Sequence, residues 1–175
     1  MDILQKIIIN KRKEVSFQKK AVPLNKLIDL NMRQFERPVS SMREALSNSS
    51  SGVIAEFKRK SPSKGWIFPD AKVEDVVPAY EDGGAAACSI LTDFEFFGGT
   101  FEDLKSARKL VRIPLLRKDF IIEEYQIYQS RAMGADAVLL IASVLTPDDC
   151  LQFARKAHEL NMEALLEIHS EDELR

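Results

Sequence analysis

The chain has 175 residues, of which 45% are hydrophobic and 30% are charged, and its formal net charge at pH 7 is −2. This length and composition are typical of one globular domain with a sizeable core, and the weak net charge favours neither nucleic acid nor an anionic membrane surface as a partner. The apolar run Ile7–Ile9 is too short for a signal peptide or a membrane span, and Cys88 and Cys150 lie in apolar settings, so we expect a cytoplasmic protein with two free, buried thiols.

Residues 1–48 are predicted to be helical. Apolar side chains recur at helical spacing between Ile3 and Ile8, and two further short helices are indicated around Leu27 and Ala45, with prolines between them. The first helix also carries a basic face, which we interpret as solvated surface and which consists of Lys6, Lys11, Arg12 and Lys13.

From residue 49 onward, apolar strand patterns alternate with helical patterns. Strands are predicted at residues 53–57, 86–92, 113–119, 137–142 and 163–169. Their centres are 34, 27, 23 and 27 residues apart, which is the spacing of successive βα units. Right-handed crossovers then predict a parallel sheet with helices outside it.

Several helix boundaries are marked by particular residues. Thr100 with Asp103 and Thr146 with Asp149 are capping-box patterns. Pro78 requires its helix to begin near Glu74, so that the proline falls in or next to the first turn. Residues 93–99, rich in phenylalanine and glycine, are predicted to be a loop.

A third capping pattern, Ser170 with Glu173, predicts one more helix, and the chain ends two residues later. We therefore expect an α/β fold of the (β/α)8 TIM-barrel type with extra N-terminal helices, truncated after about five strands. The expected organisation is an N-terminal helical extension at 1–48 and a partial barrel, units one to five, at 49–175. A complete doubly wound sheet of five strands is the alternative.

Charged pairs follow three of the predicted strands: Glu56 with Lys58, Lys118 with Asp119, and Glu167 with His169. Working residues of parallel α/β folds lie at the carboxyl ends of strands, and alternation places four of these side chains inward: Glu56, Lys58, Lys118 and Glu167. Two acids and two lysines beside aromatic surface suit an anionic, aromatic substrate and acid–base chemistry without a metal.

Each of these features also has a plainer interpretation. Glu56 and Lys58 are equally well explained as an exposed ion pair, Asp119 as a structural cap, and the cluster Phe94–Phe97 as packing. The basic run at 58–64 resembles a localisation or phosphate patch, although its strand-to-turn setting argues against a localisation signal. The two histidines and two cysteines lack metal-ligand spacing, and no nucleotide-binding glycine motif is present. We therefore expect no metal site.

At these residues the chain resembles the indole-3-glycerol phosphate synthase family of tryptophan biosynthesis. The resemblance extends over essentially the whole chain, and the E-x-K-x-x-S-P-S pattern followed by K-D-F is specific. The segments that carry it are AEFKRKSPSKG (Ala55–Gly65), SILTD (Ser89–Asp93), FFGG (Phe96–Gly99), LLRKDFII (Leu115–Ile122), GADAVLLIA (Gly134–Ala142) and LLEIH (Leu165–His169).

The resemblance implies a role for each matched residue. Lys118 matches the general acid of ring closure, and Glu167 matches a carboxylate of the later proton transfers. Glu56 and Lys58 match a strand-one pair, in which the lysine meets the anionic groups of the substrate and shares the dehydration step. The remaining matched residues are Ser61 and Pro62 beside the anthranilate carboxylate, and Phe97, Phe120 and Leu139 against the aromatic ring.

The implied activity is that of a carbon–carbon lyase, a carboxy-lyase that needs no cofactor. Its substrate is 1-(2-carboxyphenylamino)-1-deoxyribulose 5-phosphate, and the reaction consists of ring closure, decarboxylation and dehydration. Because the later strands and phosphate loops of the family are missing, we expect this chain alone to be inactive and to self-associate, whereas the full-length form is expected to be a monomer. The alternatives are another phosphosugar-binding barrel enzyme or a non-catalytic half-barrel fragment.

Overall fold

The computed structural model describes residues 2–174. Its N-terminal helices are α1 (Ile3–Ala21), α2 (Leu24–Leu30), α3 (Met32–Glu36) and α4 (Met42–Asn48). The elements that follow are β1 (Ile54–Phe57), β2 (Lys60–Ser61), β3 (Gly65–Trp66), α5 (Val73–Asp82), β4 (Ala87–Leu91), α6 (Phe94–Phe97), α7 (Phe101–Leu110), β5 (Leu115–Lys118), α8 (Glu124–Ala132), β6 (Ala137–Ile141), α9 (Pro147–Glu159), β7 (Glu163–Glu167) and the 3-10 turn η1 (Asp172–Leu174). Within this part of the chain, no helix combines the length and apolarity that a membrane crossing requires.

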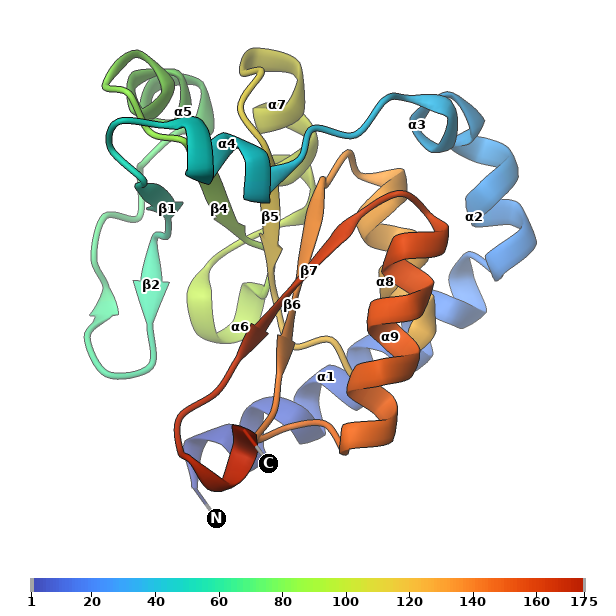
Figure 1. The fold of residues 1–175 in the computed structure, drawn as a ribbon. Coiled ribbons are helices and arrows are strands. Elements are labelled where there is room, and N and C mark those ends of the chain that lie inside the picture. Colours follow the sequence, from blue (N-terminus) through green and yellow to red (C-terminus); the bar gives the residue numbers. More distant parts are fainter. Residues whose placement is uncertain (1, 175) are drawn as a thin grey trace.

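The central sheet is parallel and has five strands in the order β1-β4-β5-β6-β7 (Figure 1). Each strand therefore lies beside the next one along the chain. A doubly wound sheet would reverse its strand order at a switch point, and this sheet does not. The order is that of five successive units of a (β/α) barrel, which confirms the predicted parallel sheet and rules out the doubly wound alternative.

The two faces of the sheet bury different sets of side chains because successive residues of a strand point to opposite faces. The outer face, which includes Cys88, Ile90 and Leu140, packs against the helices that connect the strands. The inner face packs Leu116 and Leu139 into a smaller cluster with Met42 of α4. Figure 1 shows α4 near the ends where the strands begin and α1 across the ends to which the strand arrows point.

Asp136, at the start of β6, ties the N-terminal helices to this scaffold. It is completely buried, and one carboxylate oxygen accepts from Arg37 Nη2 at 2.9 Å and Ser40 N at 3.1 Å. The other oxygen accepts from Arg108 Nη1 at 2.7 Å and Leu115 N at 2.9 Å. One carboxylate thus joins the segment before α4, helix α7 and strand β5.

Several helix boundaries follow the predicted caps. The capping boxes of Thr100 and Thr146 are both formed. The predicted start of the next helix near Glu74 is confirmed, because α5 begins at Val73. The placement of Pro78 in or next to the first turn was wrong, because the proline lies inside the helix, beyond that turn. The helix tolerates it because the proline ring suits helical φ, and because burial of Val73 and Val77 outweighs one missing hydrogen bond.

Short elements were the ones that the sequence patterns did not reveal. Residues 93–99 were predicted to be a loop, but they contain the single-turn helix α6. Helix α3 was also not predicted, and the turn after β1 carries the two-residue pair β2–β3. Periodicity is read over about 11–18 residues for a helix and about 4–8 for a strand, so it does not detect helices and strands as short as these.

Candidate functional site

Lys118 and Glu167 meet at the carboxyl edge of the sheet. Lys118 ends β5 and Glu167 ends β7, and their Nζ and Oε2 atoms are 3.0 Å apart, with each side chain 31% exposed. The pair borders a cavity of about 240 Å³, which is lined by Leu91, Phe97, Lys118, Asp119, Phe120, Leu139, Ile141 and Glu167. The structure therefore brings together five of the nine predicted site residues: Phe97, Lys118, Phe120, Leu139 and Glu167.

One wall of this cavity is aromatic. The rings of Phe97 and Phe120 have centroids 6.0 Å apart and planes inclined at 36°. Phe97 is placed by α6, whose N-terminus is capped by Asp93: Oδ1 of Asp93 accepts from Phe96 N at 2.9 Å. Gly98 ends this helix in the left-handed region with φ +64°, a conformation that favours glycine. The site is thus an apolar slot with a charged pair at its rim.

Glu56 and Lys58 form a second ion pair, with Nζ and Oε1 2.7 Å apart and about a third of each side chain exposed. In the register of the sheet, Glu56 lies opposite Ser89, and it shares its face of β1 with Ile54, which packs into the inner cluster. The pair does not line the 240 Å³ cavity described above. Its geometry therefore fits either an exposed ion pair or part of the site.

Ser61 ends β2 and Pro62 follows it in the β2–β3 turn, and neither lines that cavity. Pro62 is exposed, while Oγ of Ser61 accepts from the backbone N–H of Lys64 at 3.2 Å. His169, which was considered at the end of the fifth strand, is 3.3 Å from the second carboxylate oxygen of Glu167. It thus borders the charged pair from the solvent side.

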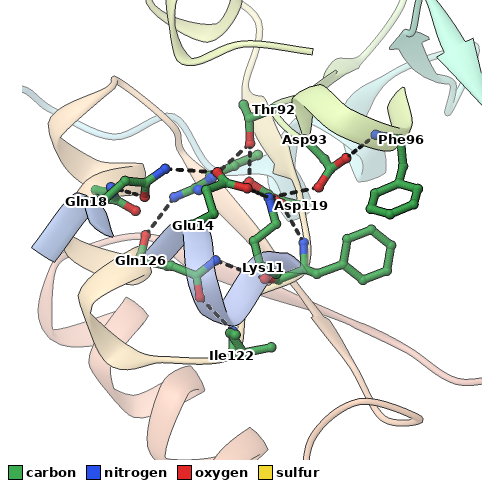
Figure 2. Close-up of polar contacts among 12 residues, drawn as sticks. Lys11, Glu14, Gln18, Thr92, Asp93, Phe96, Asp119, Ile122 and Gln126 are labelled. Carbon is green, nitrogen blue, oxygen red and sulfur yellow. Dashed lines mark hydrogen bonds and ion pairs between the residues drawn. The ribbon is translucent and has the colours of Figure 1, made fainter. Parts of the chain in front are cut away.

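The prediction of a solvated basic face on α1 was wrong for Lys11. Lys6, Arg12 and Lys13 are exposed, but Lys11 is completely buried and lies between Asp93 and Asp119 (Figure 2). Its Nζ atom is 2.9 Å from Asp93 Oδ2, 2.9 Å from Asp119 Oδ1 and 2.8 Å from Glu14 Oε2. The sequence did contain a signal: Lys11 lies four residues from Ile7 and from Val15, both buried, and so falls within the apolar stripe of α1.

Asp119 is the centre of this buried network, and four donors satisfy its carboxylate. Oδ1 faces Lys11 and accepts from the backbone N–H of Phe120 at 2.8 Å. Oδ2 accepts from Thr92 Oγ1 at 2.6 Å and from Arg117 Nη2 at 2.9 Å. Every contact holds the carboxylate ionised and fixed, so this geometry favours a structural cap rather than a catalyst.

The charges within the network also set its protonation. Burial alone would raise the pKa of Asp119, but Lys11, then Arg117 and the hydrogen bond from Thr92, outweigh it and hold that pKa well below its usual range. Burial alone would lower the pKa of Lys11, but the charges of Asp119, Asp93 and Glu14 raise it above its ordinary value. Both groups are therefore charged across the whole neutral range.

The fold and the position of the cavity define the class of protein: a (β/α)-barrel protein with its candidate site at the carboxyl ends of the strands. A family model described as indole-3-glycerol phosphate synthase matches residues 4–175. The chain belongs to this family.

Proteins named indole-3-glycerol phosphate synthase are similar to the chain over nearly all of its length. The one from Bacteroides thetaiotaomicron is 55% identical over 175 residues, which cover 99% of this chain and 66% of that protein. The one from Neisseria meningitidis serogroup B is 48% identical, with 99% and 67% covered, and one from Prochlorococcus marinus is 43% identical, with 99% and 59% covered. The chain thus spans about two thirds of the length of these curated relatives.

Proposed function

We propose that this chain supplies the first five βα units of an indole-3-glycerol phosphate synthase that acts in the cytoplasm in tryptophan biosynthesis. The reaction converts 1-(2-carboxyphenylamino)-1-deoxyribulose 5-phosphate to indole-3-glycerol phosphate, carbon dioxide and water. The observation that carries the proposal is the Lys118–Glu167 pair, 3.0 Å apart, at the rim of a cavity with an aromatic wall. In this division of the chain, residues 1–48 are a helical extension and residues 49–175 are barrel units one to five.

Lys118 acts as the general acid of ring closure. The carbon of the aromatic ring that bears the carboxylate attacks the ribulose carbonyl, and the Lys118 ammonium donates a proton to the carbonyl oxygen as the new carbon–carbon bond forms. Loss of carbon dioxide then restores aromaticity. Glu167, held 3.0 Å from Lys118, is placed to take part in the later proton transfers of dehydration.

The aromatic ring of the substrate packs against Phe97, Phe120 and Leu139, which line the cavity beside the charged pair. Stacking there would orient the ring for attack on the carbonyl, and orientation is the main contribution that a protein makes to a step of this kind.

The pair at the end of β1 contributes from the opposite side. Lys58 meets the anionic groups of the substrate and shares the dehydration step with Glu56, while Ser61 and Pro62 flank the anthranilate carboxylate. This part of the proposal is supported by the inward face that Glu56 shares with Ile54.

A polypeptide of these 175 residues is proposed to have little turnover of its own and to self-associate, with neither nucleic acid nor a membrane surface as a partner. Association is supported by strand β7, where Leu165 and Leu166 are 40% and 49% exposed although they point to opposite faces of the sheet. The complete enzyme is proposed to be a monomer.

The test uses a chimera in which this chain is followed by the C-terminal third of the Bacteroides thetaiotaomicron relative. We expect the chimera to form indole-3-glycerol phosphate from the carboxyphenylamino substrate and the 175-residue chain to form almost none. Lys118→Ala should abolish turnover with little change in melting temperature, because the side chain is part-exposed. The matched control is Lys105→Ala, which removes an exposed lysine paired with Glu102 and should leave turnover unchanged.

Three outcomes would contradict the proposal. A folded chimera without turnover of this substrate would favour another phosphosugar barrel enzyme. An active Lys118→Ala variant would remove the lysine from the chemistry. Activity of the 175-residue chain equal to that of the chimera would show that the extra third is not needed. Light scattering with and without the C-terminal third tests the half-barrel alternative, which a strictly monomeric and unaffected chain would exclude.

A further inference from the structure

Three consecutive residues, Lys118, Asp119 and Phe120, line the cavity, and the proposed reaction assigns no step to the middle one. Asp119 lies between Lys118 and Phe120, and its carboxylate accepts the backbone N–H of Phe120 at 2.8 Å. Its other donors come from outside this segment, and one of them, Lys11, comes from helix α1. The orientation of the segment from Lys118 to Phe120 therefore depends on how this carboxylate is held.

Lys11 also reaches the opposite part of the aromatic wall. Its ammonium is 2.9 Å from Asp93 Oδ2, and the other oxygen of Asp93 caps α6, the helix that carries Phe97 (Figure 2). A single buried ammonium thus contacts the two carboxylates that fix both rings of the wall, Phe97 through Asp93 and Phe120 through Asp119.

Helix α1 has other contacts that would hold it against the barrel. Val15 is buried against Tyr125, the side chains of Gln18 and Gln129 are joined by a hydrogen bond of 2.9 Å, and Lys19 pairs with Glu123. Burying an ammonium is costly, and a well-packed apolar side chain would dock the helix at least as well. The charge of Lys11 is therefore better explained by what it orients than by docking alone.

We propose that Lys11 is a positioning residue of the active site, which acts through Asp119 on Lys118 and Phe120, and through Asp93 on Phe97. The proposal rests on the proposed function for its catalytic consequence but not for its structural one. In this arrangement, the N-terminal extension contributes to the site without touching the substrate.

The first test uses the 175-residue chain and needs no activity. Lys11→Met removes the charge and keeps an unbranched side chain, while Val15→Ala weakens docking of the same helix and keeps the charge. Both variants should melt at a lower temperature than the parent chain. We expect NMR relaxation dispersion to show new motion on the microsecond-to-millisecond timescale at the Lys118, Asp119 and Phe120 amides in Lys11→Met only.

The second test measures steady-state kinetics in the chimera. Lys11→Met should lower kcat by about 10- to 100-fold with KM changed by less than about threefold, because misplaced groups cost mainly in the transition state. Val15→Ala should change neither beyond about twofold. Adding Asp93→Asn to Lys11→Met should restore melting temperature, because one unpaired buried charge is removed while the cap of α6 is kept, but it should not restore kcat.

The outcomes separate the two proposals. If Lys11→Met and Val15→Ala give the same amide dynamics, or if kcat of Lys11→Met is unchanged, Lys11 is a docking residue and the positioning role is wrong. If the double variant regains kcat together with stability, the effect was one of folding, which also refutes the role. If the parent chimera has no turnover, the proposed function fails, and the amide dynamics alone then decide whether Lys11 orders the segment.

Discussion

Replacing Asp136 by asparagine should destabilise the fold severely without touching the candidate site. Asparagine keeps one acceptor oxygen and puts an NH2 group where the other oxygen was. That NH2 would face either Arg108 Nη1 and Leu115 N, or Arg37 Nη2 and Ser40 N. In both orientations two donors lose their acceptor inside a buried site, and the two guanidinium groups lose their counter-charge.

The expected magnitude follows from these contacts. Breaking a buried charge pair by removing one partner costs about 3–5 kcal/mol, of which one unsatisfied backbone N–H accounts for about 1–3 kcal/mol. For a domain of this size that loss lowers the melting temperature by roughly 10 °C. The change should be visible in urea unfolding as a lower midpoint with an unchanged slope.

The matched control is Glu102→Gln, which breaks the Lys105–Glu102 pair on the exposed surface of α7, where Glu102 is 77% exposed. Its effect should stay below about 0.5 kcal/mol. A loss of less than about 1 kcal/mol in Asp136→Asn would refute the reasoning, because the four contacts would then not be worth more than a surface pair.

Three further predictions concern other buried groups. Because its pKa is lowered, the ionised carboxylate of Asp119 stabilises the fold above the unfolded value of about 3.9, and this contribution is lost as pH falls from there towards the folded value. The raised pKa of Lys11 acts in the opposite sense: its contribution is present below about 10.4 and is lost as pH rises towards the folded value. The difference in unfolding free energy between the parent chain and Lys11→Met should thus be constant from about pH 5 to 9 and become smaller at lower and higher pH. Loss of this difference near pH 7 would contradict the prediction. Gly99→Ala should lower the free energy of unfolding by more than about 3 kcal/mol or prevent folding, because the added Cβ would lie 2.1 Å from the backbone oxygen of Leu91. The control Gly52→Ala has open space around it and should cost only about 1–2 kcal/mol, because of its positive φ. Equal melting temperatures of the two variants would exclude the clash. Burial raises the pKa of the Cys88 thiol to about 12, so a thiol reagent at pH 8 should modify the half-buried Cys150 first, as read by mass spectrometry, and equal rates would contradict the burial.

The succession of strands and helices was predictable because the βα unit repeats regularly along the chain. Buried strands are apolar runs such as Ala137–Ile141, and helices such as α7 and α9 begin at a residue whose side chain caps them, as Thr146 does. These signals are local, so they can be read from a single sequence. The strand ends followed from them, and the strand ends predicted that Lys118 and Glu167 point inward at the same edge of the sheet. That the two side chains form an ion pair was not predicted.

Residues whose partners lie far along the chain were not predictable in the same way. Lys11 falls within the apolar stripe of α1, but lysine is ordinarily a surface residue. The carboxylates that let it be buried follow β4 and β5, about 80 and 110 residues further along the chain. Arg117 is similar: it follows an apolar run and was assigned no role, yet it is buried against Asp119 and Thr92. Cys150 was expected to be buried and is only half-buried: it is on the same face of α9 as the buried Phe153, but it lies near the start of the helix, where it lines an open cavity with Leu145 and Leu166.

The docking of α1 also constrains the order in which the chain folds during its synthesis. Lys11 leaves the ribosome about a hundred residues before Asp119, which at ordinary elongation rates is a delay of about 5–20 s. Throughout that time the stripe of Ile7 and Val15 has no barrel to cover it. Helix α1 is therefore made before the strands that it docks against and is seated only after them, and until then its apolar stripe is open to chaperones or to a neighbouring nascent chain.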